Sequence, residues 1–212
     1  RAILDALPSR ADRRVEFIHA SVRELADALA VRGGALIVRH GLAREEIGRL
    51  ADELGVDAVY ANRDYEPAAR ERDAAVAADL AGRGIAWHAC KDQVIFEAGE
   101  ILTQAGRPFS VFTPYRNAWL RALTPADLRS HVPPPSCGTL ARPPRGVAAG
   151  LPSLAALGFE TTNLRELRIA TGMAGGAALF ADFRDRIDAY RDARDFPAVK
   201  GPSYLSVHLR FG

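Results

Sequence analysis

Residues 111–120 read Val-Phe-Thr-Pro-Tyr-Arg-Asn-Ala-Trp-Leu, an extended apolar run that turns abruptly into a helix. Thr113 is placed to cap the first free amides of that helix, because a threonine hydroxyl accepts a hydrogen bond well at this point. Pro114 suits the first helical position, where the missing N–H of proline costs nothing. We therefore expect the helix to begin at Pro114.

The helix that follows carries large apolar side chains. If this segment is helical, neighbouring faces of the helix carry Tyr115, Trp119 and Leu120. Together they present more aromatic and aliphatic surface than is stable in water. The stretch is therefore predicted to form a packed corner that closes one domain.

The composition is that of a folded globular protein. The 212 residues are 48% hydrophobic and 25% charged, which excludes disorder of the whole chain and allows one full core and part of a second. The net charge of +2 is far weaker than that of a domain that binds nucleic acid by charge alone. Charge therefore neither supports nor excludes a DNA partner.

Cysteine and histidine give no sign of a disulfide framework or a metal centre. Cys90 and Cys137 stand on dissimilar segments with no clustered ligands nearby. The histidines are scattered without ligand spacing, and we expect structural or exposed roles for them: His19, His40, His88, His131 and His208. We expect no metal site, and the cysteine usage favours a reducing cytoplasm.

The ends of the chain and its apolar runs bear on its organisation. No apolar run approaches the roughly 20 residues that cross a bilayer, and no signal peptide opens the chain, so no membrane partner is expected. The sequence begins with Arg1 rather than Met and ends at Gly212 directly after a patterned stretch. We therefore expect a piece of a longer protein, truncated at both ends.

The first half of the chain alternates between two hydrophobic periods. Apolar residues recur at spacings of three and four over residues 13–31, which predicts an amphipathic helix, and residues 35–38 are typical of a strand covered on both faces. The alternation continues with helices over 47–54 and 67–83 and strands over 58–61 and 85–89. This order predicts an α/β fold with a doubly wound, Rossmann-like parallel sheet. No Gly-x-Gly-x-x-Gly follows a strand, so an ordinary dinucleotide-binding domain is not indicated.

The second half changes character. Residues 124–152 contain seven prolines and three glycines, which sustain neither a helix nor a central strand. We interpret residues 124–162 as an interdomain linker that separates an α/β domain over residues 1–123 from the start of a helical domain over residues 163–212. The helical period over residues 177–191 is carried by Leu179, Phe180, Phe183, Ile187 and Tyr190.

Three sequence blocks, in order, resemble the DNA photolyase/cryptochrome family. Residues 111–120, preceded by Leu102-Thr103 and Gly106-Arg107-Pro108-Phe109, resemble the end of the N-terminal α/β domain of that family. An earlier block matches its second helix and third strand and then its Tyr-x-Asn-x-x-Tyr-Glu-Pro motif, through Ser21, Leu25, Leu29, Gly33, Leu36, Val38, Gly41, Tyr60, Asn62, Tyr65, Glu66, Pro67, Arg72 and Asp73. Residues 190–212 resemble the opening of the helical FAD-binding domain.

The chain also departs from the pattern of the family. The first strand, with its Trp-Phe-Arg-x-Asp-Leu-Arg signature, is absent. Pro202 stands where the family has Thr, Tyr204 where it has Arg, and Val207-His208 where Pro-Tyr is common. Proline at 202 removes one backbone N–H donor from the segment that would contact the flavin diphosphate.

The resemblance implies a light-dependent DNA repair enzyme, a deoxyribodipyrimidine photo-lyase. Such an enzyme splits cyclobutane pyrimidine dimers by electron transfer from excited reduced FAD, so damaged DNA is the implied partner and no catalytic side chain is expected in this chain. By the resemblance, Tyr190, Ser203, Leu205 and Ser206 contact FAD and Arg194 reaches the DNA. The implied parent is a monomer, and this chain alone is expected to be inactive.

The residues themselves allow a simpler reading beside each of these roles. Hydroxyls and amides near a helix start hold a diphosphate well, which suits Ser203 and Ser206, but residues 201–203 could equally be a turn that caps the next helix. Arg194 beside Asp195 could equally be a solvated surface pair. Asp64 and Glu66 are more simply read as the cap of the following helix than as an acid/base pair.

Two other functions stay open from the sequence. One is a cryptochrome-type photoreceptor, which keeps the flavin but signals. The other is a small nucleotide- or flavin-binding α/β module of the electron-transfer-flavoprotein or stress-protein type, which residues 190–212 disfavour. The resemblance also implies an antenna chromophore, methenyltetrahydrofolate or a deazaflavin, in the α/β domain. Arg107 stands where folate-binding members carry an acidic residue.

Overall fold

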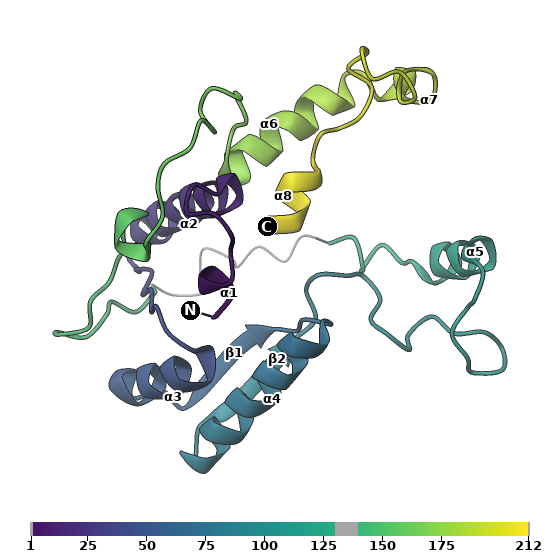
Figure 1. Cartoon of the computed structure of the whole chain (residues 1–212). Coiled ribbons are helices and arrows are strands. Elements are labelled where there is room, and N and C mark those ends of the chain that lie inside the picture. The colour runs from purple at the N-terminus through teal and green to yellow at the C-terminus, as the bar shows by residue number, and fades with distance from the viewer. Residues whose placement is uncertain (1, 130–139, 212) are drawn as a thin grey trace. The chain divides into compact units, whose positions relative to one another are not determined.

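The structure of the chain is a computed structural model that describes residues 2–129 and 140–211. It divides into two compact units, one formed by Arg1–His40 with Thr139–Gly212 and the other by Gly41–Gly138 (Figure 1). The central part of the predicted linker, with Cys137 and His131, lies outside the described residues.

The second unit is an α/β arrangement around a parallel pair of strands. Its elements are α3 (Ala43–Leu54), β1 (Ala58–Asn62), α4 (Pro67–Gly82), β2 (Ala86–Cys90) and α5 (Phe112–Ala122). The strands pair in parallel from Ala58↔Ala86 to Asn62↔Cys90. Helix α4 contacts both α3 and β2, so the helices cover one side of the strands (Figure 1). The predicted α/β class and the parallel pairing are thereby confirmed.

The hydrophobic core of this unit lies between the helices and the strands. Leu80 is fully buried, and the core cluster comprises Ala51, Val76, Leu80 and Ile85, with Ile47, Val56, Val59 and Trp87 packed against it. Alternate side chains of a strand point to opposite faces, so Tyr60 and His88 project from the other face. Their rings stack at 4.6 Å, and Tyr60 is largely exposed.

The first unit is built on one long helix. Its elements are α1 (Ala2–Asp5), α2 (Arg13–Val31), η1 (Ala155–Leu157), α6 (Gly172–Arg184), η2 (Ile187–Ala189), α7 (Tyr190–Ala193) and α8 (Ser206–Phe211). Helix α2 has the bounds that its hydrophobic period predicts. It packs along α6, and α6 in turn contacts α8.

Side chains of α2 determine where α6 begins. Gly172 has a left-handed φ of 70°, and its N–H donates to Ser21 Oγ at 3.1 Å. The N–H of Ala174 donates to Glu24 Oε1 at 2.9 Å. A carboxylate at a helix start satisfies free amides and opposes the helix dipole. Helix α6 therefore starts five residues before the predicted position and ends at Arg184 rather than 191.

The described part of the predicted linker is anchored to α2. His19 Nε2 lies 2.8 Å from the carbonyl oxygen of Pro152, and the N–H of Thr162 donates to Glu16 Oε2 at 2.7 Å. The compact units consequently group α2 with residues 139–212, whereas the domain scheme from the sequence places it in an α/β domain over residues 1–123.

Residues 35–38 do not form the predicted strand. Ile37 makes an isolated parallel bridge with Gly150, whose N–H donates to the carbonyl oxygen of Leu36 at 2.8 Å. A strand requires a neighbour along its length, and this apolar segment has a single point of pairing in the part of the chain described. Its apolar pattern predicts burial but not a partner.

The stretch around α5 also differs from expectation. The helix begins at Phe112, and Val111 stands at the N-cap with no side-chain hydrogen bond, so Thr113 is not the cap and Pro114 is the third helical residue. Proline is still tolerated there because the first amides of a helix lack intrahelical partners. No residue of α5 is buried, so the packed corner was a wrong prediction.

Two aromatic side chains of α5 instead make ring contacts outside the core, while Phe112 is largely exposed. Trp119 meets Phe96 edge-on at 5.5 Å, and Tyr115 lies 6.1 Å from Phe109. Leu120 is half exposed. Two ring contacts thus cover part of an apolar surface that the sequence alone would place in a core.

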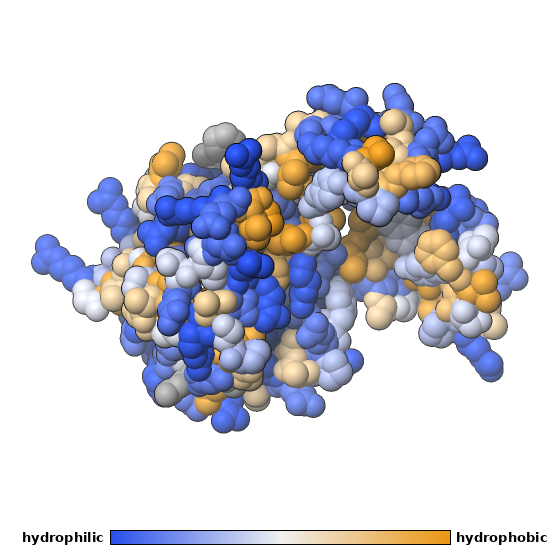
Figure 2. All heavy atoms as spheres, turned by 45° about the horizontal axis from the view of Figure 1, so that its top comes forward, coloured by the Kyte–Doolittle hydropathy of each residue, from blue (hydrophilic) through white to orange (hydrophobic). Residues whose placement is uncertain are grey.

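The surface is mainly hydrophilic, with hydrophobic residues reaching it in several places (Figure 2). In the first unit the exposed apolar side chains include Met173, Phe180, Ile187, Phe196, Tyr204 and Leu209. None of the helices in the described ranges combines the length and the apolar character that a membrane span needs.

The buried position of Leu80 yields a stability prediction. Leu80→Ala is expected to lower the free energy of unfolding by about 2–5 kcal/mol, because the mutation leaves a cavity in the core between α3, α4 and the strands. Leu120→Ala, at a half-exposed position, should cost about 1 kcal/mol or less. Urea unfolding followed by circular dichroism measures both, and equal losses would contradict this description of the core.

Candidate functional site

The residues that the resemblance assigns to FAD lie at the end of the first unit. Tyr190 opens α7, Ser206 opens α8, and Ser203 and Leu205 belong to the loop between these helices. Ser203, Leu205 and Ser206 are adjacent through the sequence. Their approach to α7 depends on tertiary structure.

Gly201 brings the loop against α7. This glycine is buried, and a Cβ atom at its position would lie 2.6 Å from the carbonyl oxygen of Ala193 and 2.8 Å from the backbone nitrogen of Arg194. A real Cβ does not approach backbone atoms this closely, so only glycine permits the contact. The backbone of the candidate loop thereby rests on the end of α7.

The two serines differ in their surroundings. Ser203 is half buried, and its Oγ accepts a hydrogen bond from the N–H of Leu205 at 3.4 Å. Ser206 is exposed at the start of α8. Tyr204 between them adopts a left-handed φ of 57°, which turns the chain sharply. Ser203 thus takes part in a turn, as the simpler reading predicts, while the Ser206 side chain is exposed at the surface.

Tyr190 and Arg194 form a small aromatic and cationic stack. The Tyr190 ring meets Phe183 edge-on at 5.8 Å, and the Arg194 guanidinium carbon lies 5.8 Å from the centre of the Tyr190 ring. Arg194 Nε also lies 3.6 Å from Asp195 Oδ1, and both side chains are exposed. Arg194 is therefore accessible to a phosphate, although the surface pair with Asp195 is present as well.

An ionic group beside the loop was missed by the sequence analysis. Asp182 in α6 accepts hydrogen bonds from Lys200 Nζ at 2.7 Å and from Arg186 Nε at 3.0 Å. The hydrogen bond from Lys200, followed by that from Arg186, holds the pKa of the Asp182 carboxyl below its usual value. The four-residue spacing of Asp182 and Arg186 is readable from the sequence, but the contact with the loop is not.

Other residues considered from the sequence have structural roles. Asp64 Oδ1 accepts a hydrogen bond from the N–H of Tyr65 at 2.7 Å, in the turn that leads into α4. His208 is buried, and its Nε2 lies 2.9 Å from the carbonyl oxygen of Ala170. Within residues 2–129 and 140–211, no three metal-binding side chains are grouped together.

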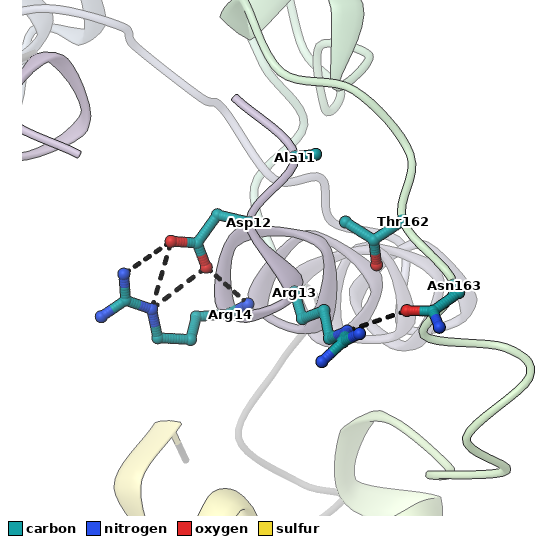
Figure 3. Close-up of a pocket in the computed structure, with 6 residues that line it drawn as sticks. All are labelled: Ala11, Asp12, Arg13, Arg14, Thr162 and Asn163. Carbon is teal, nitrogen blue, oxygen red and sulfur yellow. Dashed lines mark hydrogen bonds and ion pairs between the residues drawn. The ribbon is translucent and has the colours of Figure 1, made fainter. Parts of the chain in front are cut away.

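A pocket of about 510 Å³ opens at the start of α2 (Figure 3). Ala11, Asp12, Arg13, Arg14, Thr162 and Asn163 line it. Asp12 caps α2 by accepting the N–H of Arg14 at 2.8 Å, and the Arg14 side chain binds its carboxylate at 2.6 Å. Arg13 Nε donates to Asn163 Oδ1 at 2.9 Å. The charged side chains of this pocket bind other groups of its lining, which indicates a role in stabilising the fold.

A second pocket, of about 460 Å³, lies in the α/β unit. Leu102, Gln104, Phe109, Thr113, Pro114, Asn117, Ala118 and Arg121 line it. Two hydrogen bonds close the neighbouring loop. The N–H of Thr103 donates to the carbonyl oxygen of Arg107 at 2.8 Å, and the N–H of Arg107 donates to Thr103 Oγ1 at 3.1 Å. The Arg107 side chain is exposed on this loop.

Residues 3–136, which span the α/β unit and α2, match the family model described as DNA photolyase. The chain belongs to the DNA photolyase family. The resemblance that the motifs indicate is thus confirmed at the level of the family.

Individual proteins, among them named photolyases, are similar to nearly the whole chain. An uncharacterized 31.6 kDa protein of Synechococcus is 36% identical over 200 residues, covering 94% of this chain and 68% of that protein. The deoxyribodipyrimidine photo-lyase of Halobacterium salinarum is 34% identical over 214 residues, covering 98% of this chain and 43% of that protein. The crystal structure of a class III photolyase from Agrobacterium tumefaciens has a TM-score of 0.79 at 26% identity, covering 97% of this chain and 42% of that one. The chain thus spans less than half the length of these two photolyases.

The close approach at Gly201 predicts that the stability of the chain is sensitive to a side chain at this position. Gly201→Ala is expected to lower the free energy of unfolding by about 1–3 kcal/mol, because the new methyl group meets the backbone of α7, which cannot rotate away. Gly82→Ala is the matched control, since nothing lies within 4 Å of its Cβ position. The control should be neutral or stabilising by up to about 1 kcal/mol, measured by urea unfolding. A tolerated alanine at 201 would contradict the described contact.

The cap of α2 predicts a pH dependence. The hydrogen bond from the Arg14 side chain lowers the pKa of Asp12 from 3.8 to about 2. Because the pKa is lower in the folded state, the ionised carboxylate stabilises the fold above about pH 4, and this stabilisation is lost as the pH falls toward about 2. Asp12→Asn keeps a capping side chain but does not titrate. The stability difference between wild type and variant should shrink over this window, and a constant difference would contradict the assignment.

Proposed function

We propose that the protein carrying this chain is a deoxyribodipyrimidine photo-lyase, which uses light to split cyclobutane pyrimidine dimers in damaged DNA. The observation that carries the proposal is that similarity to the photo-lyase of Halobacterium salinarum extends over 98% of this chain, through the α/β unit and the candidate FAD loop. A module restricted to an α/β fold would match only the first of these parts.

FAD is the cofactor in this proposal, and its chemistry is to supply the electron that opens the dimer when the reduced flavin is excited. The hydroxyls of Ser203 and Ser206 would bind the diphosphate, and Tyr190 and Leu205 would contact the cofactor beside it. The accessible hydroxyls and the loop packed on α7 support this assignment. Arg194 would bind a DNA phosphate with its exposed guanidinium.

The finer features of the fold are proposals as well. We propose that β1 and β2 belong to a doubly wound sheet, because two strands alone leave both sheet edges and one face uncovered. The domain scheme with an α/β domain, a linker over residues 124–162 and a helical FAD-binding part belongs to the same proposal. A monomer in the cytoplasm is the corresponding expectation for the whole protein.

An antenna chromophore, methenyltetrahydrofolate or a deazaflavin, is proposed for the α/β unit. The pocket that includes Gln104, Phe109 and Asn117 offers an aromatic side chain and amide groups to a planar heterocycle. The exposed Arg107 at its neighbouring loop favours an anionic group on that ligand over a cationic one.

The FAD assignment predicts the effect of removing two hydroxyl donors. Ser203→Ala combined with Ser206→Ala is expected to weaken FAD binding by about a hundredfold or more, since each of the two hydrogen bonds to a charged phosphate contributes about 1.5–3 kcal/mol. Ser110→Ala, at an exposed position in the other unit, is the control and should leave binding unchanged. Flavin fluorescence titration measures the affinities. Equal affinity of wild type and double variant would refute this site.

The activity itself is tested on the intact gene product. We expect bound and reduced FAD, and loss of cyclobutane dimers from irradiated DNA under near-UV light but not in the dark. Flavin binding and a light response without loss of dimers would instead identify a cryptochrome-type photoreceptor. Nucleotide binding without either property would favour the small α/β module.

A further inference from the structure

The guanidinium of Arg186 donates hydrogen bonds to the backbone carbonyl groups of the loop that precedes Ser203. Arg186 donates from Nη1 to the carbonyl oxygen of Gly201 at 3.0 Å and from Nη2 to that of Pro202 at 2.9 Å. Nη1 also donates to the carbonyl oxygen of Lys200. Three consecutive carbonyl groups therefore turn toward a single cation.

The guanidinium is fixed on its other side by α6. Its Nε donates to Asp182 Oδ2 at 3.0 Å, and its carbon lies 5.5 Å from the centre of the Phe183 ring. Lys200 binds the same carboxylate from the loop side. The Arg186 side chain is 20% exposed, so these bonds are partly shielded from water. The loop is thus tied to α6 through one well-held side chain.

This arrangement decides which backbone groups the loop presents. The described peptide bonds are trans, so the carbonyl and the N–H of each peptide unit point in opposite directions. Since the carbonyl of Pro202 turns toward Arg186, the N–H of Ser203 is directed to the opposite side. Pro202 itself contributes no N–H, which makes the direction of the next amide more important to an anion.

We propose that Arg186 is a positioning residue for diphosphate binding: it draws the carbonyl oxygens of residues 200–202 to one side, so that the N–H of Ser203 faces the anion. The proposal rests on the assignment of this loop to FAD. Carbonyl oxygens released from Arg186 could turn toward the phosphates and repel them. Arginine suits the task because its planar fork serves several acceptors at once, whereas a lysine ammonium is a compact point charge.

Amide hydrogen exchange of the 212-residue chain tests the positioning directly, without any ligand. In Arg186→Gln we expect the hydrogen-bonded amides of Val199, Gly201 and Leu205 to exchange at least about tenfold faster than in wild type, while the amides of α2 keep their rates. The control is Arg184→Gln, at an exposed arginine of the same unit, and it should change the exchange rates neither in the loop nor in α2. Unchanged exchange at Val199, Gly201 and Leu205 would overturn the proposal.

A ligand comparison separates positioning from a general structural effect. FAD carries a diphosphate and riboflavin does not, so Arg186→Gln should weaken FAD binding about tenfold and leave riboflavin binding unchanged. Arg186→Lys should recover only part of the FAD affinity. Equal losses for both ligands, or full rescue by lysine, would overturn the proposal. Both affinities are measured on the intact gene product. If the intact wild-type protein binds neither ligand, the FAD assignment fails, and the exchange experiment still decides whether Arg186 orders the loop.

Discussion

Polar side chains of helix α2 hold the segment that leads to the candidate FAD site, and the order of the first unit depends on these bonds. Residues 152–171 contain little regular structure, so their backbone groups need partners from elsewhere. Glu16 binds the backbone and hydroxyl of Thr162, and Ser21 binds the first amide of α6. Because these bonds set the start of α6, they also set the place of every element that follows it.

The same requirement operates at the candidate site. A loop without helix or strand must satisfy its carbonyl groups, and here Arg186 satisfies three of them while Gly201 allows the backbone to lie on α7. Arg186 follows the end of α6 by two residues, and its guanidinium is held there by Asp182 of that helix. If the proposed FAD site is right, stability and ligand recognition are connected, since the groups that order the loop also decide which of its dipoles face outward.

The sequence was most informative where the hydrophobic pattern of a segment depends only on that segment's own helix or strand. The hydrophobic period predicted α2 with its observed ends, and apolar runs placed β1 and β2 within one residue. It was less informative where a segment needs a partner to form regular structure. Residues 35–38 have the composition of a strand but pair with a neighbour at a single bridge. The start of α5 was misplaced because the proline was assigned to the first helical position, although the whole first turn tolerates it.

The amino-acid sequence by itself determined the order of helices and strands in the α/β unit, the membership of the family and the position of the candidate FAD residues along the chain. Tertiary structure alone decided that α2 binds a segment 146 residues away and that Arg186 gathers the carbonyl groups of residues 200–202. The reason is physical. Periodicity records which face of one element avoids water, whereas a hydrogen bond depends on two groups meeting in space, and nothing in the local pattern of either group specifies the other.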